Sequence, residues 1–204
     1  MKIFSIVGAR PQFIKLAPLS TALAGVHEEI IVHTGQHYDY AMSEKIFIDL
    51  GIREPDIHLE INAGNSTSQI TQMMLMLDSA MIKFKPDLVI VFGDTNSTFA
   101  GAMVAAKLNI PIVHIEAGLR SYNRGMPEEI NRIVTDHVSK YLFAPTQTAV
   151  DILKKEGLEK NAFFTGDIMV DTMKNNLEIA LSKSTIIVDF KLAHPTYNLL
   201  TLHR

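Results

Sequence analysis

The sequence predicts an α/β fold of the doubly wound, Rossmann-like type, in which helices cover both faces of a parallel sheet. Four short segments rich in Ile and Val, each bounded by Gly, Asp or Pro, have the composition of fully buried strands: residues 2–7, 28–34, 87–93 and 110–116. The segments between them carry apolar residues at helical spacing. Strand and helix therefore alternate along the chain, which is the signature of this fold class.

Three helices are expected between these strands, at residues 10–25, 66–85 and 96–109. The first two place apolar side chains three or four residues apart, and the methionines near position 74 are expected to fill the core. The third is rich in small residues, which allow a helix to pack closely on a sheet.

The second half continues the alternation more weakly, with helices at 127–140, 146–157 and about 170–182 and strands at 141–145 and near 162–166. Residues 182–197 are irregular and Pro195 interrupts them, whereas 198–204 have the composition of a further strand. We therefore expect residues 1–185 to form one Rossmann-like domain, and residues 186–204 to form a linker and the first strand of a second, truncated domain. The expected core stripe of the helix at 127–140 is Ile130, Ile133, Val134, His137 and Val138.

Composition excludes several classes of protein. The chain has 204 residues, no cysteine and a formal net charge of −3. A slightly acidic protein is not expected to hold nucleic acid by bulk charge. No apolar run approaches the roughly 18 to 20 residues needed to cross a bilayer. The apolar run at the start of the chain is too short for a secretion signal. The absence of disulfides and thiolate metal sites fits a cytoplasmic protein.

Two acidic residues stand where apolar runs end: Asp94 follows Gly93, and Glu116 follows residues 111–115. In an open parallel sheet, the loops after the carboxyl ends of the strands line the ligand crevice. If the two strands are neighbours, their axes lie roughly 5 Å apart and both carboxylates can address one small molecule. The alternative is structural: Asp94 would cap the helix that starts near Asn96, and Glu116 would bond loop amides.

The segment GARPQFIK follows the first strand and opens the first helix, where Pro11 suits the first helical position. Arg10, Lys15 and the unpaired amides of this helix terminus predict a site for an anion such as phosphate. The alternative is that both cations are solvated. The segment lacks the glycine pattern of a dinucleotide fingerprint and of a P-loop, which disfavours hydride chemistry with a nicotinamide held in the usual way.

Glu128 lies opposite the expected core stripe of its helix, alongside Arg132 and Thr135, so packing does not require it. It is a candidate third acid of the crevice. The alternative is that it favours the helix dipole and pairs with Arg132.

The histidines differ in the roles that their positions predict. His33 and His37 straddle Gly35 after a strand, so they lack the helical geometry of metal ligands, and a polar loop that faces the substrate is expected there. His203 ends an apolar segment as Asp94 and Glu116 end theirs, although a core or capping histidine is the alternative.

Six motifs occur in order along the chain: GARPQFIKLAPL, TGQHYDYAMS, GDTNST, HIEAGLRS, MPEEINR and LTLHR. In this set and order the chain closely resembles the non-hydrolysing UDP-N-acetylglucosamine 2-epimerases, whose opening motif is G-x-R-P-x-x-x-K. The ordered set is far more specific than any single motif.

The resemblance implies two Rossmann-like domains around a cleft, as in GT-B glycosyltransferases. It implies a cytoplasmic homodimer that interconverts UDP-GlcNAc and UDP-ManNAc for cell-surface polysaccharides without metal or other cofactor. The proton at sugar C2 is removed, UDP leaves C1 to give a 2-acetamidoglucal, and UDP adds again after protonation on the other face. By matching motifs, Asp94, Glu116 and Glu128 correspond to the essential acids and His203 to the essential histidine.

The same matching assigns Arg10 and Lys15 to the basic positions near the nucleotide sugar, and His37 to the loop that faces the substrate. Which acid takes the C2 proton stays open. The second domain of the family should follow Arg204, so no turnover is expected from these residues alone.

Other functions remain open on the sequence. The sugar could carry other substituents, as in a UDP-2,3-diacetamido uronic acid. A GT-B glycosyltransferase would need an acceptor and would exchange no C2 proton. A non-catalytic fragment that binds nucleotide sugars would keep affinity without turnover. Nucleic-acid and membrane partners are not expected.

Overall fold

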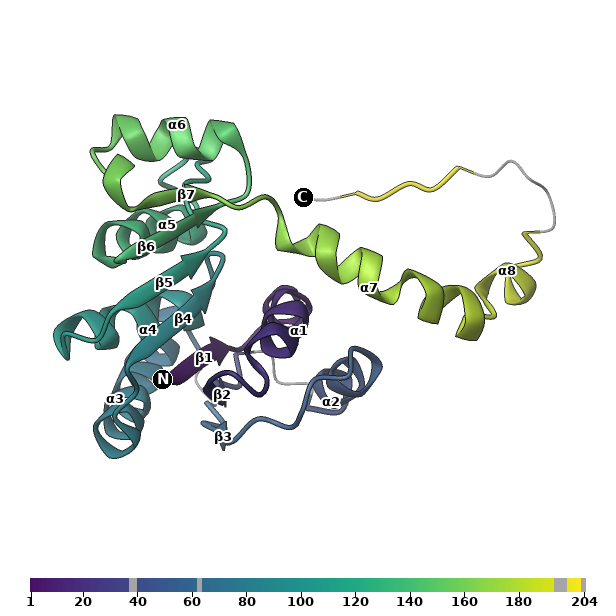
Figure 1. Cartoon of the computed structure of the whole chain (residues 1–204), viewed down its shortest axis with the longest axis horizontal. Helices are drawn as coiled ribbons and strands as arrows, with labels where there is room; N and C mark the ends of the chain where they lie inside the picture. The colour runs from purple at the N-terminus through teal and green to yellow at the C-terminus, as the bar shows by residue number, and fades with distance from the viewer. Residues whose placement is uncertain (37–39, 62–63, 193–197, 203–204) are drawn as a thin grey trace.

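The computed structural model describes residues 1–36, 40–61, 64–192 and 198–202. Seven parallel strands form one sheet in the order β3-β2-β1-β4-β5-β6-β7 (Figure 1). The strands are β1 (Lys2–Val7), β2 (Glu28–His33), β3 (Ile57–His58), β4 (Leu88–Phe92), β5 (Ile112–Ile115), β6 (Tyr141–Ala144) and β7 (Ala162–Phe164). The predicted doubly wound, Rossmann-like class is confirmed, and so is the adjacency of β4 and β5.

Helices cover both faces of the sheet (Figure 1). They are α1 (Arg10–Leu23), α2 (Tyr40–Asp49), α3 (Ser66–Phe84), α4 (Asn96–Lys107), α5 (Pro127–Val138), α6 (Gln147–Lys155), α7 (Ile168–Lys183) and the single turn α8 (Ile186–Asp189), with a 3₁₀ turn at Glu159–Asn161. The sequence prediction did not include α2, β3 or α8. A polar loop was expected in the segment HTGQHYDYAMSE, residues 33–44, whereas helix α2 begins within this segment, at Tyr40.

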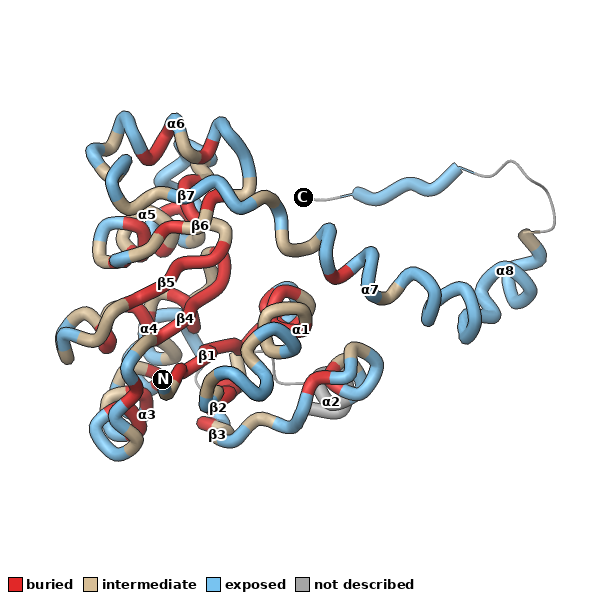
Figure 2. Tube along the Cα trace, viewed as in Figure 1, coloured by how far each residue is buried: buried red, intermediate tan, exposed pale blue. Residues whose placement is uncertain are grey.

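The core has two layers because alternate residues of each strand face opposite sides of the sheet. On one side, Phe4 and Ile6 of β1 pack with Met73 and Leu77 of α3 and with alanines of α4. On the other side, the apolar residues of α1 and α2 pack on the opposite face of the same strands. Figure 2 shows the resulting continuous buried band through β1, β4 and β5.

Helix α5 presents the opposite face from the one its periodicity predicts. Glu129, Asn131, Thr135 and Asp136 are buried, whereas Ile130 is 49% exposed. The predicted core stripe from Ile130 to Val138 was therefore wrong: its His137 is exposed and Ile133, Val134 and Val138 are only partly buried. The polar face can be buried because hydrogen bonds and ion pairs from distant segments satisfy it, and these partners offset its desolvation.

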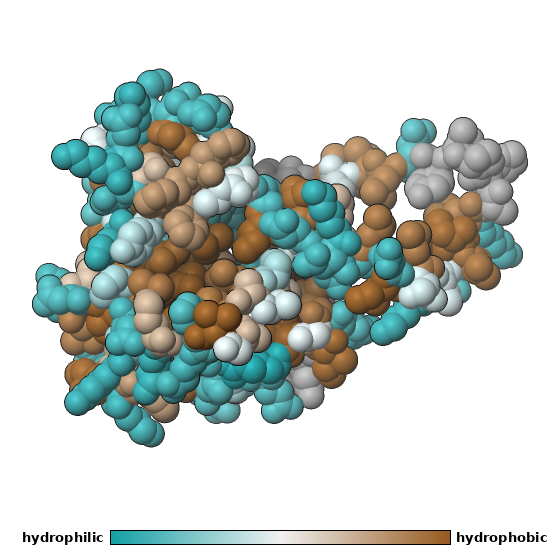
Figure 3. Space-filling model, in the orientation of Figure 1, coloured by the Kyte–Doolittle hydropathy of each residue, from teal (hydrophilic) through white to brown (hydrophobic). Residues whose placement is uncertain are grey.

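The segment from α7 onward extends away from the sheet (Figure 1). Helix α7 contacts the rest of the molecule through α1, where Thr172 Oγ1 donates to the Ile14 carbonyl at 2.7 Å. Beyond this contact, apolar side chains such as Met173 and Leu181 are exposed. Figure 3 shows hydrophobic surface, in brown, along the segment that extends away from the sheet. Residues 198–202 carry no strand, so the strand expected at 198–204 is not found in the part described. The domain division at residue 185 stays a prediction.

Within residues 1–36, 40–61, 64–192 and 198–202, no helix combines the length and apolar character needed to cross a membrane.

Candidate functional site

A pocket of about 550 Å³ opens at the carboxyl edge of the sheet, beside the neighbouring strands β1 and β4. The loops from these two strands lead to helices on opposite faces, α1 and α4, which makes this position the topological switch point. Residues from the first turns of α1, α3, α4 and α5 line the pocket, among them Pro11, Ser66, Asn96 and Glu128. The positive dipole ends of these helices lie at the pocket, whereas the carboxyl groups of Asp94 and Glu128 contribute negative charge.

Asp94 lines this pocket and is held from two sides by α5. Its carboxylate forms an ion pair with the Arg132 guanidinium, and its backbone carbonyl accepts a hydrogen bond from Asn131 Nδ2 at 2.9 Å. Thr95, not Asp94, is the N-cap of α4, because its side chain accepts from the Thr98 amide. The structural alternative for Asp94 therefore does not hold.

Glu116 lies on the neighbouring strand end and forms an ion pair with Lys15 of α1. A methyl group placed on Gly93 would lie 3.6 Å from Glu116 Oε2 and 3.5 Å from Lys15 Nζ, so this ion pair packs directly against the residue before Asp94. Glu116 also has a left-handed backbone, with φ of +73°, which is uncommon for a residue other than glycine. Such local strain is a frequent property of functional sites.

The Glu116 side chain faces a second, smaller hollow of about 240 Å³, which Asp167 and Asp171 also line. The three predicted acids are therefore not all in one cavity. Asp94 and Glu128 share the larger pocket, and Glu116 lies in the adjoining hollow, next to Lys15.

Lys15 is buried, which corrects the alternative that it is a solvated cation. Burial lowers the pKa of its ammonium group, and the nearby Arg132 adds to this effect. Asp94 and Asp167 act in the opposite direction without restoring the ordinary pKa. Arg10, by contrast, is exposed at the start of α1.

The amides at the start of α1 are partly used within the protein. The side-chain oxygen of Gln12 accepts hydrogen bonds from the amides of Gly8 and Ala9, at 2.8 and 3.0 Å. The side-chain nitrogen of Gln12 donates to the Phe92 carbonyl at 2.9 Å. Gln12 thus joins the first loop to the end of β4, and the expected phosphate site at this terminus loses two of its donors.

Glu128 and Glu129 are consecutive residues in different surroundings. Glu128 is partly exposed in the larger pocket. Glu129 is 1% exposed and accepts hydrogen bonds from the amides of Ser121 and Tyr122 and an ion pair from Arg132. Burial alone would raise the pKa of the Glu129 carboxyl, but these donors hold it below its ordinary value.

The sequence did not predict roles for Glu129, Asn131 or Gln12. It predicted Arg132 only as the alternative ion-pair partner of Glu128. In the structure Arg132 bridges Glu129 to Asp94 instead. A signal was present in MPEEINR, since a helix that carries four charged or amide side chains within five residues has a polar face that can be buried against partners.

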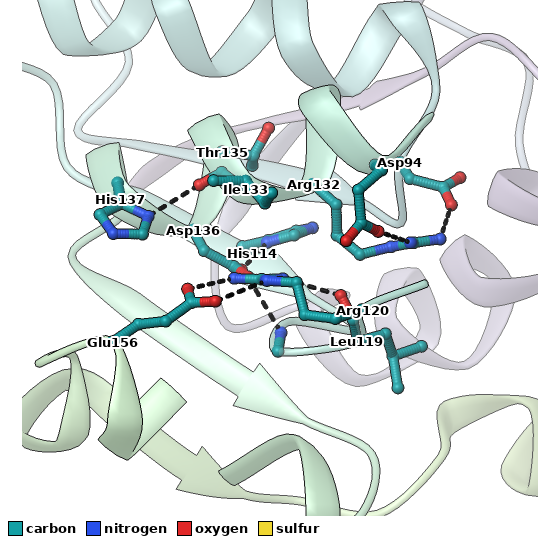
Figure 4. A network of polar contacts seen from close by, with 12 residues as sticks. Asp94, His114, Leu119, Arg120, Arg132, Ile133, Thr135, Asp136, His137 and Glu156 are labelled. Atoms are coloured by element: carbon teal, nitrogen blue, oxygen red, sulfur yellow. Dashed lines mark hydrogen bonds and ion pairs between the residues drawn. The ribbon is translucent and has the colours of Figure 1, made fainter. Parts of the chain in front are cut away.

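A second polar network lies beneath the site (Figure 4). It joins His114 of β5, Asp136 of α5, Arg120 and Glu156.

Two predicted residues, His37 and His203, lie outside the described residues. Among the residues that the structure describes, no cluster of three or more His, Asp or Glu side chains is arranged to hold a metal ion.

Several known proteins are similar to this chain in sequence and fold. A family model described as UDP-N-acetylglucosamine 2-epimerase matches residues 22–204. A UDP-N-acetylglucosamine 2-epimerase homolog of Methanococcus maripaludis is 50% identical over the whole chain, which corresponds to 57% of that protein. A UDP-2,3-diacetamido-2,3-dideoxy-D-glucuronate 2-epimerase of Pseudomonas aeruginosa is 52% identical over 84% of the chain and 50% of its own length.

Among solved structures, the UDP-GlcNAc 2-epimerase of Methanocaldococcus jannaschii in complex with UDP-GlcNAc and UDP superposes with a TM-score of 0.88. It is 44% identical, and the match covers 95% of this chain and 54% of that one. The chain spans about half the length of the relatives it matches.

Proposed function

Because the chain belongs to the UDP-N-acetylglucosamine 2-epimerase family, we propose that it supplies the first half of the catalytic site of an enzyme that interconverts UDP-GlcNAc and UDP-ManNAc. The observation that carries the proposal is the pocket at the switch point, where Asp94 and Glu128 face one space and the Lys15–Glu116 ion pair adjoins it. The rest of the site would come from a region that corresponds to the second half of the relatives.

In the proposed reaction a carboxylate removes the proton from C2 of the sugar. The C–H electron pair forms the C1–C2 double bond as the C1–O bond breaks, and UDP leaves with the electrons of that bond. A proton then returns to C2 from the opposite face, and UDP adds again at C1. The products are the C2 epimer and a regenerated acid and base, so no cofactor is consumed.

Asp94, Glu116 and Glu128 are the proposed acids and bases. General acid–base catalysis requires a carboxyl group within hydrogen-bond reach of the proton that it moves. Arg132 forms an ion pair with Asp94, and Lys15 forms one with Glu116, so a neighbouring cation holds each of these carboxylates in place. Glu128 has a different environment, partly open to solvent, which suits a group that exchanges protons with water.

UDP would lie over the helix N-termini of the larger pocket. The departing diphosphate gains negative charge at the transition state, and amides, dipole ends and cations placed before the reaction stabilise such charge. Arg10 at the start of α1 is the proposed cation from this half of the site. His37 and His203 remain proposals from the motif match.

We also propose that the protein acts in the cytoplasm as a homodimer with a GT-B-like pair of domains. Support for dimerisation comes from apolar side chains that are exposed on α3 and α5, the two helices that pack on either side of α4, such as Leu75, Ile82 and Ile130. Size-exclusion chromatography with light scattering should report a dimer, and Ile130→Glu should give a monomer. A monomeric unsubstituted protein would contradict the dimer.

The test of function uses the chain joined to the remaining residues of the Methanocaldococcus jannaschii epimerase, here called the joined protein. It is incubated with UDP-GlcNAc in heavy water and followed by NMR. We expect UDP-ManNAc to form with deuterium at C2, and no turnover from the 204-residue chain alone. Deuterium at C2 separates this reaction from glycosyl transfer.

Variants then connect the reaction to the site. Asp94→Asn, Glu116→Gln and Glu128→Gln should each remove most of the C2 exchange. Glu159→Gln is the matched control, because the Glu159 side chain is 60% exposed and pairs with Lys154 at the surface. Full exchange in the three site variants would reject the proposed roles of these acids. The proposed function would be rejected if the joined protein showed no exchange while the Methanocaldococcus jannaschii enzyme was active in parallel.

A second substrate has specific support. The Pseudomonas aeruginosa relative, 52% identical, is named for a UDP-2,3-diacetamido uronic acid. The same exchange assay with that sugar nucleotide decides between the two, since the acids would be unchanged and only the fit of the C3 and C6 substituents would differ.

A further inference from the structure

His114 is a fully buried side chain in the middle of β5, and both of its ring nitrogens contact oxygen atoms (Figure 4). Nε2 lies 2.7 Å from the Gly93 carbonyl oxygen, and Nδ1 lies 2.7 Å from Asp136 Oδ1. A carbonyl oxygen only accepts hydrogen bonds, so Nε2 must carry a hydrogen and donate it.

The group facing Nδ1 is an acceptor as well. Asp136 accepts a hydrogen bond from the Gly118 amide at 3.1 Å and an ion pair from Arg120 at 2.7 Å. Both of these partners are donors, and donors of this kind favour the ionised form of a carboxyl group. An ionised carboxylate has no hydrogen to give, so Nδ1 must donate too.

The surroundings can hold a charged ring. Arg120 lies between Asp136 and Glu156, forms an ion pair with Asp136 at 2.7 Å, and donates to both Glu156 oxygens at 2.9 and 2.6 Å. Buried charges persist in proteins when they are paired and hydrogen-bonded, as they are here.

The His114 ring therefore fixes the position of the backbone at Gly93, where the loop that carries Asp94 begins. The Gly93 carbonyl belongs to the same planar peptide unit as the Asp94 amide. His114 holds that carbonyl, while the Gly93 amide donates to the Ile115 carbonyl at 2.9 Å. Both hydrogen-bonding groups of Gly93 are thus fixed by consecutive residues of β5, immediately before Glu116.

Asp136 fixes the other side of the same arrangement. Its second oxygen holds the Gly118 amide, two residues after Glu116. The His114–Asp136 pair consequently connects the loop that carries Asp94 to the loop that carries Glu116. In the described part of the chain, no other pair of hydrogen-bonded side chains connects α5 to both Gly93 and Gly118.

We propose that His114 is a positioning residue: a doubly protonated ring that sets Asp94 relative to Glu116 through the Gly93 carbonyl, without contact with the substrate. The catalytic consequence rests on the function proposed above, whereas the protonation of the ring does not.

The first experiment reads the ring directly. The chain is produced with ¹⁵N-labelled histidine, and the His114 signals are assigned by their loss in His114→Gln. At neutral pH we expect two N–H signals from the His114 ring. A single N–H signal would overturn the proposal. In Asp136→Asn the amide can donate to Nδ1, so the ring should keep only its Nε2 hydrogen, on the Gly93 carbonyl.

The second experiment measures the effect on catalysis in the joined protein. We expect His114→Gln to lower kcat for C2 exchange by about 10²-fold with little change in KM, because displacement of a catalytic group by about 1 Å costs that much. His137→Gln is the matched control, since His137 is exposed on the same helix as Asp136. An unchanged kcat would overturn the proposal.

If His114→Gln does not fold, His114→Asn is the second variant. Loss of the fold in both would overturn the positioning role in favour of a purely structural one. If the unsubstituted joined protein shows no exchange, the proposed function fails, and the ring signals still decide the protonation state.

Discussion

The guanidinium group of Arg132 forms an ion pair with the carboxylate of Asp94, 38 positions earlier in the chain, and a second ion pair with Glu129. Arg132 is largely buried, at 16% side-chain exposure. Pairs of this kind differ from surface ion pairs, which are worth little, because loss of one partner leaves a poorly solvated charge behind. Arg132 therefore holds the candidate acid in position.

Replacement of Arg132 should reveal this dependence. We expect Arg132→Met in the joined protein to lower the rate of C2 exchange by about 10²-fold, because Asp94 loses the group that orients it. Arg132→Lys should keep part of the rate, since it retains the charge without the planar fork. Arg124→Met is the control in the exposed loop before α5. An exchange rate in Arg132→Met equal to that of the control would count against the role.

The adjacent glutamates of α5 should separate catalysis from stability. Glu129→Gln should destabilise the fold by about 2 kcal/mol, because hydrogen bonds from the Ser121 and Tyr122 amides lose a charged acceptor. Glu128→Gln should change stability by less than about 0.5 kcal/mol and yet lose exchange. Urea unfolding of the chain measures the first effect, and NMR in heavy water measures the second. Equal loss of stability in both variants would contradict the distinction.

Asp136 predicts a specific dependence of stability on pH. Its pKa is lowered from 3.8, so below that pH the unfolded chain binds more protons than the folded chain. The stabilisation is then fully present above pH 3.8 and is lost as the pH falls toward the folded pKa. We expect the free energy of unfolding to fall less steeply with acidification in Asp136→Asn than in the unsubstituted chain. Parallel curves for the two proteins would show that Asp136 is not responsible.

The fold could be predicted because buried parallel strands are rich in Ile and Val, and this composition is recognisable in the sequence. The apolar runs before Asp94 and Glu116 predicted both the sheet and the adjacency of β4 and β5, since one helix joins them. Strand β3 has two residues, Ile57 and His58, too few to leave such a record.

The positions of Asp94 and Glu116 after β4 and β5 could be predicted from the sequence, whereas the groups that contact these residues could not. Periodicity assumes that the apolar face of a helix is the buried one, and α5 breaks this assumption at Ile130 and Asp136. The partners that allow the polar face to be buried, His114 and Ser121 among them, come from other segments. A pattern within one segment contains no information about such partners.

Gly118 provides a last test of how firmly the loop after Glu116 is held. Gly118 and Gly51 both have a left-handed backbone, with φ of +81° and +65°. A methyl group on Gly51 would meet nothing within 4 Å, so Gly51→Ala should cost only the strain of that conformation, about 1 kcal/mol.

A methyl group on Gly118 would lie 2.5 Å from the Ala149 carbonyl oxygen of α6, which belongs to rigid backbone. Gly118→Ala must therefore move the loop or the helix, and movement of the loop pulls the Gly118 amide away from Asp136. We expect a loss of stability clearly larger than that of Gly51→Ala, together with faster hydrogen exchange of the residue 118 amide. If the two variants unfold at the same urea concentration, the loop has room to adjust to the added methyl group. The hydrogen bond from the Gly118 amide to Asp136 would then hold the loop less firmly than its 3.1 Å length indicates.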